Sequence, residues 1–499
     1  RRGHCVAPKF VLLWTDVVVF LLLASLFWYV WHVRRSAGLR DTWEKVFADA
    51  PALCSALVIG LFLAVTVLDS VHFRHALPRS ATEAAGAAAA YDSRTVSLLD
   101  TVLVRLIESR EASYSEPLAY EGFTKETRQV GGAAVRAFPR LLHGGARLKD
   151  PSIEWLPDVL RRAAWGLAGG LAAALVTALV VTLGYARREG LPAGQAWRLI
   201  AGNRSRLPLR AALLTWAVIC VLAGMTGALM FDYHVFGTDR TGNDILYQAL
   251  KSVRTAFVIG TLATLATLPF AIAFGIAAGY FKGWVDEIIQ YLYTTLSSVP
   301  NVLLIAACVL MVQVFIDKHP DLFATGAERS DLRLFLLCVI LGLTGWASLC
   351  RLLRAETLKL RELEYVQAAT AFGVGHWKIM LRHIMPNLMH LVLITTVLEF
   401  SGLILYEAVL TYVGVGVDPS MNSFGGMINL ARSEMSRDPI VWWSFAAAFL
   451  FMVTLVLAAN LFADGVQSAF DPRSRVFRAR LARPVAEPLP KSAVDPAQP

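Results

Sequence analysis

The most informative segment of the chain joins two apolar runs and reads Glu364-Tyr-Val-Gln-Ala-Ala-Thr-Ala-Phe-Gly-Val-Gly-His-Trp-Lys-Ile-Met-Leu-Arg-His-Ile-Met-Pro-Asn387. It predicts a helix, a glycine break and a second helix. Gly373 and Gly375 are expected to supply the turn through their freedom at positive φ. Trp377 to Ile384 are expected to form a short amphipathic helix, which Pro386 ends before the next apolar run. Such a hairpin suits docking into a groove on another subunit. The alternative is an ordinary connecting loop.

Nine apolar runs surround this segment, each long enough to cross a hydrocarbon core about 30 Å thick. In lipid such a run must be helical, because a strand would leave its backbone polar groups unpaired. The runs lie near 11–33, 52–68, 164–185, 209–231, 256–280, 288–316, 334–350, 388–412 and 441–463. The sixth run is long enough to include an interfacial turn before Pro300. We therefore predict an all-α, polytopic membrane protein.

The composition agrees with this prediction. Of 499 residues, 56% are hydrophobic and only 17% are charged, against about 25% charged residues in ordinary globular proteins. A soluble enzyme, a disordered scaffold and a collagen-like fibre are thereby excluded. The net charge of +9 is better explained by basic cytoplasmic loops than by a nucleic-acid partner. The six cysteines lie mostly inside apolar runs without a C-x-x-C pair, so we expect buried free thiols rather than disulfides or a metal site.

Arginine and lysine predict the orientation, because short cytoplasmic loops are enriched in them. These residues gather in the loops at 34–51, 186–210 and 351–382 and in the tail at 473–483. All four segments fall on one side if the spans alternate. The same parity places Arg1 outside, against the charge of Arg1, Arg2 and Lys9. Either the first run does not span, or a further span precedes Arg1.

One large polar stretch, 69–163, is expected on the outer side. It contains an alanine-rich patch at 84–90 and short helical fragments such as Thr95 to Glu108. Its arginines do not disqualify it, since long loops cross the membrane largely regardless of charge. Composition leaves two alternatives open, a small extracytoplasmic domain and a poorly ordered insertion.

The chain lacks the common catalytic motifs. No Gly-Lys dipeptide occurs, so a phosphate-binding P-loop is excluded, and H-E-x-x-H and G-x-S-x-G are also missing. The scattered His319, His376, His383 and His390 are interpreted as interfacial or packing residues. We expect a transporter subunit that is not an enzyme and binds no metal or cofactor of its own.

Ionisable residues inside the runs are candidates for a transport role. Asp16 and Glu399 are the clearest, and Glu407 lies nearer a helix end. The alternative for Asp16 is a helix that starts later than position 11. Glu399 and Glu407 are eight residues apart, about two turns, and so share one helix face. They are predicted to serve in the pathway, in gating or in packing.

The loop resembles the EAA signature of ABC-importer permeases, which has Glu-Ala-Ala, a glycine four residues later, and a hydrophobic-x-Leu-Pro ending. The matched residues are Gln367, Ala368, Ala369, Gly373, His383, Met385 and Pro386. Three positions depart from the signature, with Gln for Glu at 367, His for a hydrophobic residue at 383 and Met for Leu at 385. The departure at Gln367 removes any ionic contact that the family makes through that glutamate.

Three further matches resemble the C-type permease of the oligopeptide, dipeptide and nickel importers. They are His234 to Asp244 with Ser252 to Arg254 and Gly260, Thr411 to Ser420 with Phe424 to Met427, and Asn460 to Arg473. The family's usual Gly-Arg-Asp is Gly242-Asn243-Asp244 here, so a role of that arginine is not carried over. Thr238, Asp239 and Asp244 are equally compatible with helix capping.

The resemblance implies a six-helix permease core at 209–473 with a coupling hairpin at 364–386. An extension at 1–208, with about three spans and the outer loop 69–163, precedes the core, and a tail at 474–499 follows. The implied partners are a second homologous permease, two ATPase subunits that bind the ATP, and an extracytoplasmic substrate-binding protein, at a bacterial inner membrane. The implied cargo is a peptide, nickel or a related small solute. The residues expected to contact an ATPase are Gln367, Ala368, Ala369, Gly373, Trp377 and Pro386, and a bulky charged residue at Ala369 is expected to uncouple transport.

Two other classes of protein are weighed against the importer permease. A proton-driven transporter would use Glu399 or Asp16 as relay carboxylates and would work without an ATPase. A membrane-embedded assembly or sensor protein would use residues 69–163 as its binding module, with the spans as an anchor.

Overall fold

The computed structural model describes residues 9–77, 91–92, 94–130, 133–323 and 325–470. Within these residues, nine helical segments are long and apolar enough to span a membrane. They are α1 (Trp14–Arg35), α3 (Ala50–Asp69), α6 (Pro151–Glu189), α8 (Leu209–Leu229), α9 (Ile245–Phe281), α11 (Asn301–Lys318), α12 (Gly326–Gly345) with α13 (Ala347–Arg361), α15 (His376–Ile379) continuing into α16 (Met385–Tyr412), and α18 (Trp443–Phe470). Each predicted apolar run overlaps one of them, which confirms the all-α, multi-span fold.

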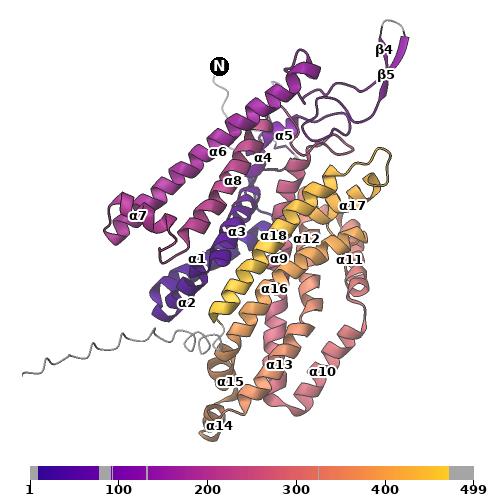
Figure 1. Cartoon of the computed structure of the whole chain (residues 1–499). Coiled ribbons are helices and arrows are strands. Elements are labelled where there is room, and N and C mark those ends of the chain that lie inside the picture. Colours follow the sequence, from indigo (N-terminus) through magenta and orange to yellow (C-terminus); the bar gives the residue numbers. More distant parts are fainter. Residues whose placement is uncertain (1–8, 78–90, 93, 131–132, 324, 471–499) are drawn as a thin grey trace, which may run out of the picture.

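The other elements are short and lie mostly at the two ends of these helices. They are α2 (Ala37–Ala48), α4 (Leu98–Val102), α5 (Val104–Glu108), α7 (Ala193–Ala201), α10 (Gly283–Ser298), η1 (Pro320–Leu322), α14 (Glu364–Ala371), the π-helical turn η2 (Met380–Ile384), α17 (Phe424–Glu434), and strands β1 (Lys9–Val11), β2 (His72–Arg74), β3 (Val96–Ser97), β4 (Glu126–Val130) and β5 (Ala133–Ala137). Figure 1 shows α14 and α15 projecting beyond one end of the long helices and the β4–β5 hairpin beyond the other.

Proline and capping residues explain where two helices differ from the predicted runs. The run at 288–316 is broken into α10 and α11 at Pro300, because the residue before a proline is driven towards extended conformation, and Val299 has φ −89° and ψ 133°. Helix α9 begins eleven residues before the apolar run at 256, since the Asp244 side chain accepts a hydrogen bond from the Tyr247 N–H at 3.2 Å and caps it. Polar residues thus extend α9 outward.

A small antiparallel sheet shows how α1 and α3 are arranged. Strand β1, before α1, pairs with β2, after α3, with Lys9 opposite Arg74. Strand β2 also pairs with β3. The start of α1 and the end of α3 therefore lie together, while α2 connects their opposite ends. The first run therefore forms a complete helix, α1, which is antiparallel to α3 and lies beside it, as expected for a helix that spans the membrane. Arg1 and Arg2 lie outside the described residues.

Helix α9 is the centre of the fold. Its residues contribute to three separate clusters of buried apolar side chains, one with α13 and the hairpin segment, one with α16 to α18, and one with α11 and α12. Burial of such side chains is the main stabilising contribution where helices exclude both water and lipid. Helix α9 therefore contacts most of the other core helices along its length.

The described part of the outer stretch 69–163 packs on the core. The predicted helical fragment from Thr95 to Glu108 forms β3, α4 and α5, and Ser97 caps α4 by accepting from the Asp100 N–H at 3.1 Å. Leu99, Leu103 and Leu106 are buried against side chains of α3 and α9. The alanine-rich patch at 84–90 lies outside the described residues.

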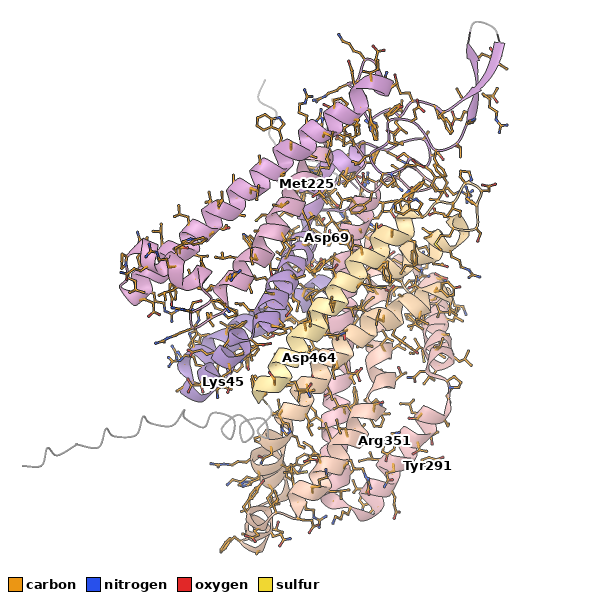
Figure 2. The ribbon with its side chains drawn as sticks, viewed as in Figure 1. Lys45, Asp69, Met225, Tyr291, Arg351 and Asp464 are labelled. Carbon is orange, nitrogen blue, oxygen red and sulfur yellow. The ribbon has the colours of Figure 1, made fainter. Side chains whose placement is uncertain are left out.

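Glycine residues bring α6 and α8 into close contact, and Figure 1 shows the two helices side by side. A Cβ added at Gly166 would lie 2.5 Å from the Gly224 carbonyl oxygen and 2.7 Å from the Met225 Cα. Met225 is labelled on α8 in Figure 2. Gly170 is equally close to the backbone of α8. Small residues at such spacing allow backbones to approach in lipid.

Substituting Gly166 with valine is expected to destabilise the protein by about 1–3 kcal/mol, because the added atoms must separate α6 from α8. The measurement is unfolding in mixed micelles containing increasing sodium dodecyl sulfate. Gly169→Val is the matched control on the same helix, since an added Cβ there meets no atom within 4 Å. Equal stability of the two variants would show that the contact between α6 and α8 does not depend on glycine.

Candidate functional site

The segment between α13 and α16 forms the predicted hairpin. Helix α14 is followed by Gly373 at φ +71°, and the chain then enters α15. The expectation that Gly375 also needs positive φ is wrong, because Gly375 has φ −58° and ψ 142° and any residue could adopt that conformation. A single left-handed glycine therefore makes the turn.

Pro386 does not end the second helix, contrary to the prediction. Helix α15 passes through η2 into α16 without a break, and Pro386 lies in the first turn of α16. The wider π-helical turn before it tolerates a residue that lacks a backbone N–H. The hairpin is thus a rigid continuation of a spanning helix.

The hairpin has a buried face and an exposed face. Val366, Ile379 and Ile384 are at most 1% exposed and pack on the inner ends of α9 and α13. The opposite face carries large apolar side chains in the open, since Phe372 is 87% and Trp377 74% exposed. Exposed apolar side chains that lie together in this way are candidates for an interaction surface.

The structure separates the predicted contact residues into two groups. Gln367, Ala368, Trp377 and Pro386 are exposed, and Gln367 donates to the Glu362 carbonyl oxygen at 3.2 Å. Ala369 instead packs, half-buried, against the core. The sequence prediction missed Phe372, although an aromatic residue directly before the turn glycine was a usable signal.

Polar contacts attach the hairpin to the inner end of α9. The Tyr280 hydroxyl lies 2.8 Å from His376 Nδ1, and Arg361 donates to the Tyr280 carbonyl oxygen at 2.5 Å. Lys282, directly after α9, forms an ion pair with Glu362 at 2.8 Å. The hairpin is therefore bonded to α9 through His376, and the end of α13 beside it is bonded to α9 through Arg361 and Glu362.

The two glutamates of α16 have different surroundings. Glu407 is 1% exposed and accepts a hydrogen bond from Thr411 Oγ1 at 2.7 Å. Glu399 is half-buried and forms no hydrogen bond or ion pair with another described residue. Glu407 is thus bonded within the packed outer end of the helix, while Glu399 has no polar partner among the described residues.

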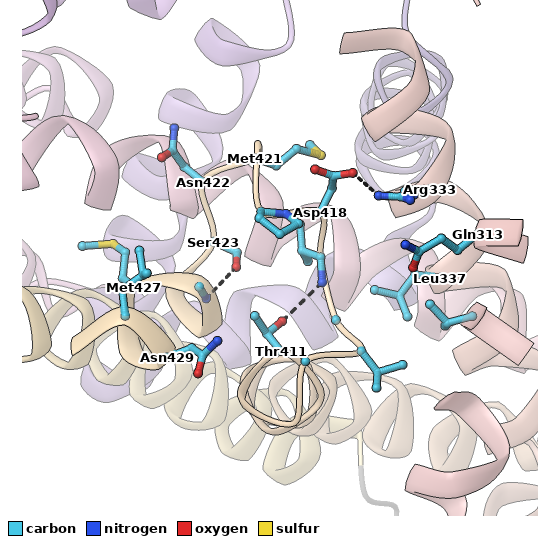
Figure 3. A pocket seen from close by; sticks show the side chains of 18 of the residues that line it. Gln313, Arg333, Leu337, Thr411, Asp418, Met421, Asn422, Ser423, Met427 and Asn429 are labelled. Atoms are coloured by element: carbon cyan, nitrogen blue, oxygen red, sulfur yellow. Dashed lines mark hydrogen bonds and ion pairs between the residues drawn. The ribbon is translucent and has the colours of Figure 1, made fainter. Parts of the chain in front are cut away.

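A pocket of about 350 Å³ opens beyond the outer end of α16. The predicted motif from Thr411 to Ser420 forms one wall, and Arg333 of α12, which pairs with Asp418, closes another, as Figure 3 shows. A second, more polar cavity of about 690 Å³ shares Arg333 and Asp418 with it. Burial raises the pKa of Asp418, but hydrogen bonds from Ser420 and Arg333 outweigh it and keep the pKa below the usual value.

A buried ion cluster links the extension to α9. Arg254 donates to Asp16 Oδ1 at 2.6 Å and to Thr15 Oγ1 at 2.7 Å, and lies 3.6 Å from Asp331 of α12. His72 Nδ1 lies 2.7 Å from Asp16 Oδ2. The alternative of a first helix that starts later than position 11 is confirmed, because α1 begins at Trp14 and Asp16 lies in its first turn. Asp16 is an ion-pair partner of the core.

Lys251 of α9 repeats this pattern one turn outward. It forms ion pairs with Asp69 at 2.6 Å and Asp100 at 3.0 Å, and Figure 2 labels Asp69 at the outer end of α3. In both clusters a cation of α9 pairs with carboxylates from residues before 208, and in the first cluster Asp331 of α12 and His72 of β2 take part as well. Ion pairs between opposite charges thus fix the position of the extension relative to α9 of the core.

A third contact of this kind involves Glu111 and His234. Glu111 accepts backbone hydrogen bonds from Leu142 at 2.8 Å, His143 at 2.7 Å and Gly144 at 3.0 Å. His234 lies 3.6 Å from it through Nε2 and 2.7 Å from Asp244 through Nδ1. Asp244 is thereby both the cap of α9 and an ion-pair partner.

Burial disfavours the charged forms of Glu111 and His234, but the partners of each group have the larger effect on its pKa. Burial raises the pKa of Glu111, whereas His234 and the backbone donors lower it to about 2. Burial lowers the pKa of His234, whereas Asp244 and Glu111 raise it to about 9. The charged pair is therefore present between these two values.

The docking of residues 109–150 is expected to weaken as pH rises. The raised pKa of His234 stabilises the fold fully below its unfolded value near 6.5, and the stabilisation, on the order of 3 kcal/mol, is lost as pH rises through about 9. Glu111 acts oppositely, its contribution being lost as pH falls through about 2. Hydrogen exchange of this segment at pH 6 and pH 10 measures the effect.

Glu111→Gln is expected to remove most of the protection already at pH 6. The exposed His143→Gln variant is the control and is expected to keep the wild-type profile. Protection that is equal at the two pH values in the wild-type protein, after correction for intrinsic exchange, would contradict the role of His234.

These features define a class of protein. A bundle of spanning helices with an outer pocket and an exposed, rigidly attached inner hairpin is a membrane permease that is driven by another subunit. Residues 271–476 match the family of the binding-protein-dependent transport system inner membrane component.

Relatives agree with this match. The oligopeptide transport system permease protein OppC of Haemophilus influenzae is 30% identical over 246 residues, which cover 49% of this chain and 72% of the relative. The glutathione transport system permease protein GsiD of Pectobacterium atrosepticum is 30% identical over 240 residues, 48% and 73% of the two chains. The dipeptide transport system permease protein DppC of Lactococcus lactis subsp. cremoris is 27% identical over 243 residues, 49% and 65%.

The chain belongs to this family of ABC-importer permeases. It is a multi-pass membrane subunit, and importers of this class include ATPase and substrate-binding components. About half of the chain is covered by each relative.

Proposed function

We propose that the chain forms one half of the transmembrane pathway of a bacterial inner-membrane ABC importer for peptides. The other half is a second homologous permease, with two ATPase subunits on the inner side and a substrate-binding protein outside. The names of the relatives, which specify oligopeptides, dipeptides and glutathione, support a peptide-like cargo. ATP is bound by the ATPase subunits and not by this chain.

The hairpin at 364–386 carries this proposal. Its exposed Phe372 and Trp377, with the small Ala368 beside Gln367, offer a surface that fits a groove on an ATPase. Closure of the ATPases pushes this surface, and the contacts of Tyr280 and Lys282 carry the displacement into α9. The core helices then rotate as rigid bodies between outward-facing and inward-facing states.

The other predicted regions take complementary roles. Residues 209–473 form the permease core and residues 1–208 the extension, which ion pairs with α9 keep in register. Glu399 faces the pathway or the second permease, where its unpaired carboxyl group can be used. Glu407 holds the outer end of α16 for gating through Thr411.

Uptake of a radiolabelled peptide by proteoliposomes containing the five-subunit complex tests this function. We expect uptake that requires ATP on the side of the membrane where the ATPase subunits lie and the binding protein on the other side. Uptake that follows an imposed proton gradient without ATPase subunits would instead identify a secondary transporter. Loss of function on deleting residues 69–163, with no effect of changes at 364–386, would identify an assembly or sensor protein.

A further inference from the structure

An apolar groove of about 560 Å³ lies between the extension and the core. Helices α1 and α3 line two sides, and residues of α9 and α18 complete it. Its lining is almost wholly apolar and includes Leu23, Leu26, Ile59, Leu63, Phe257 and Phe462. All of these positions belong to candidate membrane spans, so hydrocarbon is the solvent to which the groove opens.

The length of the groove corresponds to one leaflet. Along α1 it extends from Val19 to Tyr29, which is about 15 Å at 1.5 Å per residue. Half of a hydrocarbon core about 30 Å thick has the same depth. Helix α1 is 22 residues long, about 33 Å at 1.5 Å per residue, so a single acyl chain that starts at the level of Tyr29 would reach past the middle of the helix to the level of Val19.

Aromatic residues mark the inner interface at the Tyr29 end. Trp28 and Trp31 are 62% and 45% exposed, and Trp43 of α2 donates to the Tyr29 hydroxyl at 3.0 Å. Tryptophan and tyrosine are enriched at the headgroup level of membranes. The groove thus begins where the headgroups of the inner leaflet lie.

Basic residues follow directly. Arg34 and Arg35 are exposed and form no ion pair with any described carboxylate, and the Arg35 guanidinium stacks on the Trp31 ring at 3.7 Å. Lys45 of α2, labelled in Figure 2, adds a further charge on this side. Clusters of this kind attract anionic headgroups of the cytoplasmic leaflet.

We propose that this groove is a specific site for one anionic phospholipid of the inner leaflet. One acyl chain lies between α1 and α3, and the phosphate group pairs with Arg34 and Arg35. The lipid fills the gap between the extension and the core, adding apolar contact to the ion pairs of α9. The proposal does not depend on the identity of the transported solute.

Gly60 offers a sharp test, because it lines the groove and a Cβ added there meets no atom within 4 Å. Gly60→Phe therefore places a large side chain into the groove from a position where the Cβ itself meets no neighbour. Gly169→Phe on α6 is the matched control, with equal open space outside the groove. Leu26→Trp, which enlarges a 49% exposed lining residue, is a second filling variant if Gly60→Phe folds poorly.

The full chain is reconstituted in nanodiscs with equal amounts of phosphatidylglycerol and phosphatidylethanolamine, and native mass spectrometry counts the lipids it retains. We expect one retained phosphatidylglycerol, a fall in its occupancy of about tenfold in Gly60→Phe, and no change in Gly169→Phe. Arg34→Gln with Arg35→Gln is expected to abolish the preference for phosphatidylglycerol while leaving a retained lipid.

Equal retention by the wild type and both filling variants would overturn the proposal, as would equal loss in Gly169→Phe. An unchanged preference for phosphatidylglycerol in the double arginine variant would overturn the headgroup assignment. Loss of the lipid when the second permease is co-reconstituted would show that a protein helix occupies the groove instead.

Discussion

Replacing Arg254 with methionine is expected to destabilise the protein by about 3–5 kcal/mol, since removal of one partner leaves buried carboxylates uncompensated. The Arg254 side chain is 5% exposed and faces Asp16 at 2.6 Å and Asp331 at 3.6 Å. Both carboxylates are at most 1% exposed. The substitution weakens the contact between the extension and α9. The change in stability is measured by unfolding in mixed micelles with sodium dodecyl sulfate.

Two further variants separate this effect from a general loss of charge. Arg329→Met removes an arginine whose pair with Asp317 is about 40% exposed on both sides, and it is expected to cost less than about 1 kcal/mol. Adding Asp16→Asn to Arg254→Met is expected to recover part of the stability, because one uncompensated charge is removed. No recovery in the double variant would contradict the assignment of Asp16 as the partner.

Replacing Phe372 with glutamate is expected to weaken ATPase binding by about thirtyfold or more, the effect of losing an interface hot spot of roughly 2 kcal/mol. Phe372 is the most exposed large apolar side chain of the hairpin, at 87%. Because it is so exposed, it contributes little to the packing of this chain. Membrane insertion and stability are expected to stay normal. The measurement is the dissociation constant between the purified permease pair and the ATPase subunits.

Phe138→Glu is the matched control, because Phe138 is an exposed phenylalanine on the outer side. Ala368→Arg is expected to act like Phe372→Glu and is a better probe than the expected Ala369 substitution, since Ala369 packs against the core. If Phe372→Glu and Phe138→Glu bind the ATPase subunits equally well, the hairpin is not their contact.

Features with a local signal were predictable from the sequence. The length of each apolar run sets the span, so the nine candidate helices were found with errors mostly at their ends, and the run at 288–316 is divided at Pro300 into α10 and α11. The turn at Gly373 was also correct, because helix, glycine and helix lie within one short segment. The prediction for Gly375 was wrong because a glycine does not by itself show that positive φ is needed. The prediction for Pro386 was wrong because the π-helical turn η2 lets the helix continue through the proline.

Contacts between distant segments left no such signal. Asp16 and Arg254 are 238 residues apart, and nothing in either run indicates the other. Asp16 was therefore weighed as a transport carboxylate, although its partner lies in the core. The contact between Glu111 and His234 could not be predicted from the sequence for the same reason. The role of residues 1–208 in holding α9 thus became visible only in the fold.

The most direct test of the central claim is site-specific crosslinking from the hairpin. A photo-reactive amino acid is placed at Phe372 or, as control, at Phe138 in the chain assembled with its partners. The account predicts a crosslink from position 372 to an ATPase subunit that changes in yield when ATP is bound, and none from position 138. Absence of any ATPase crosslink from 372, in a complex that still hydrolyses ATP and imports its substrate, would contradict it.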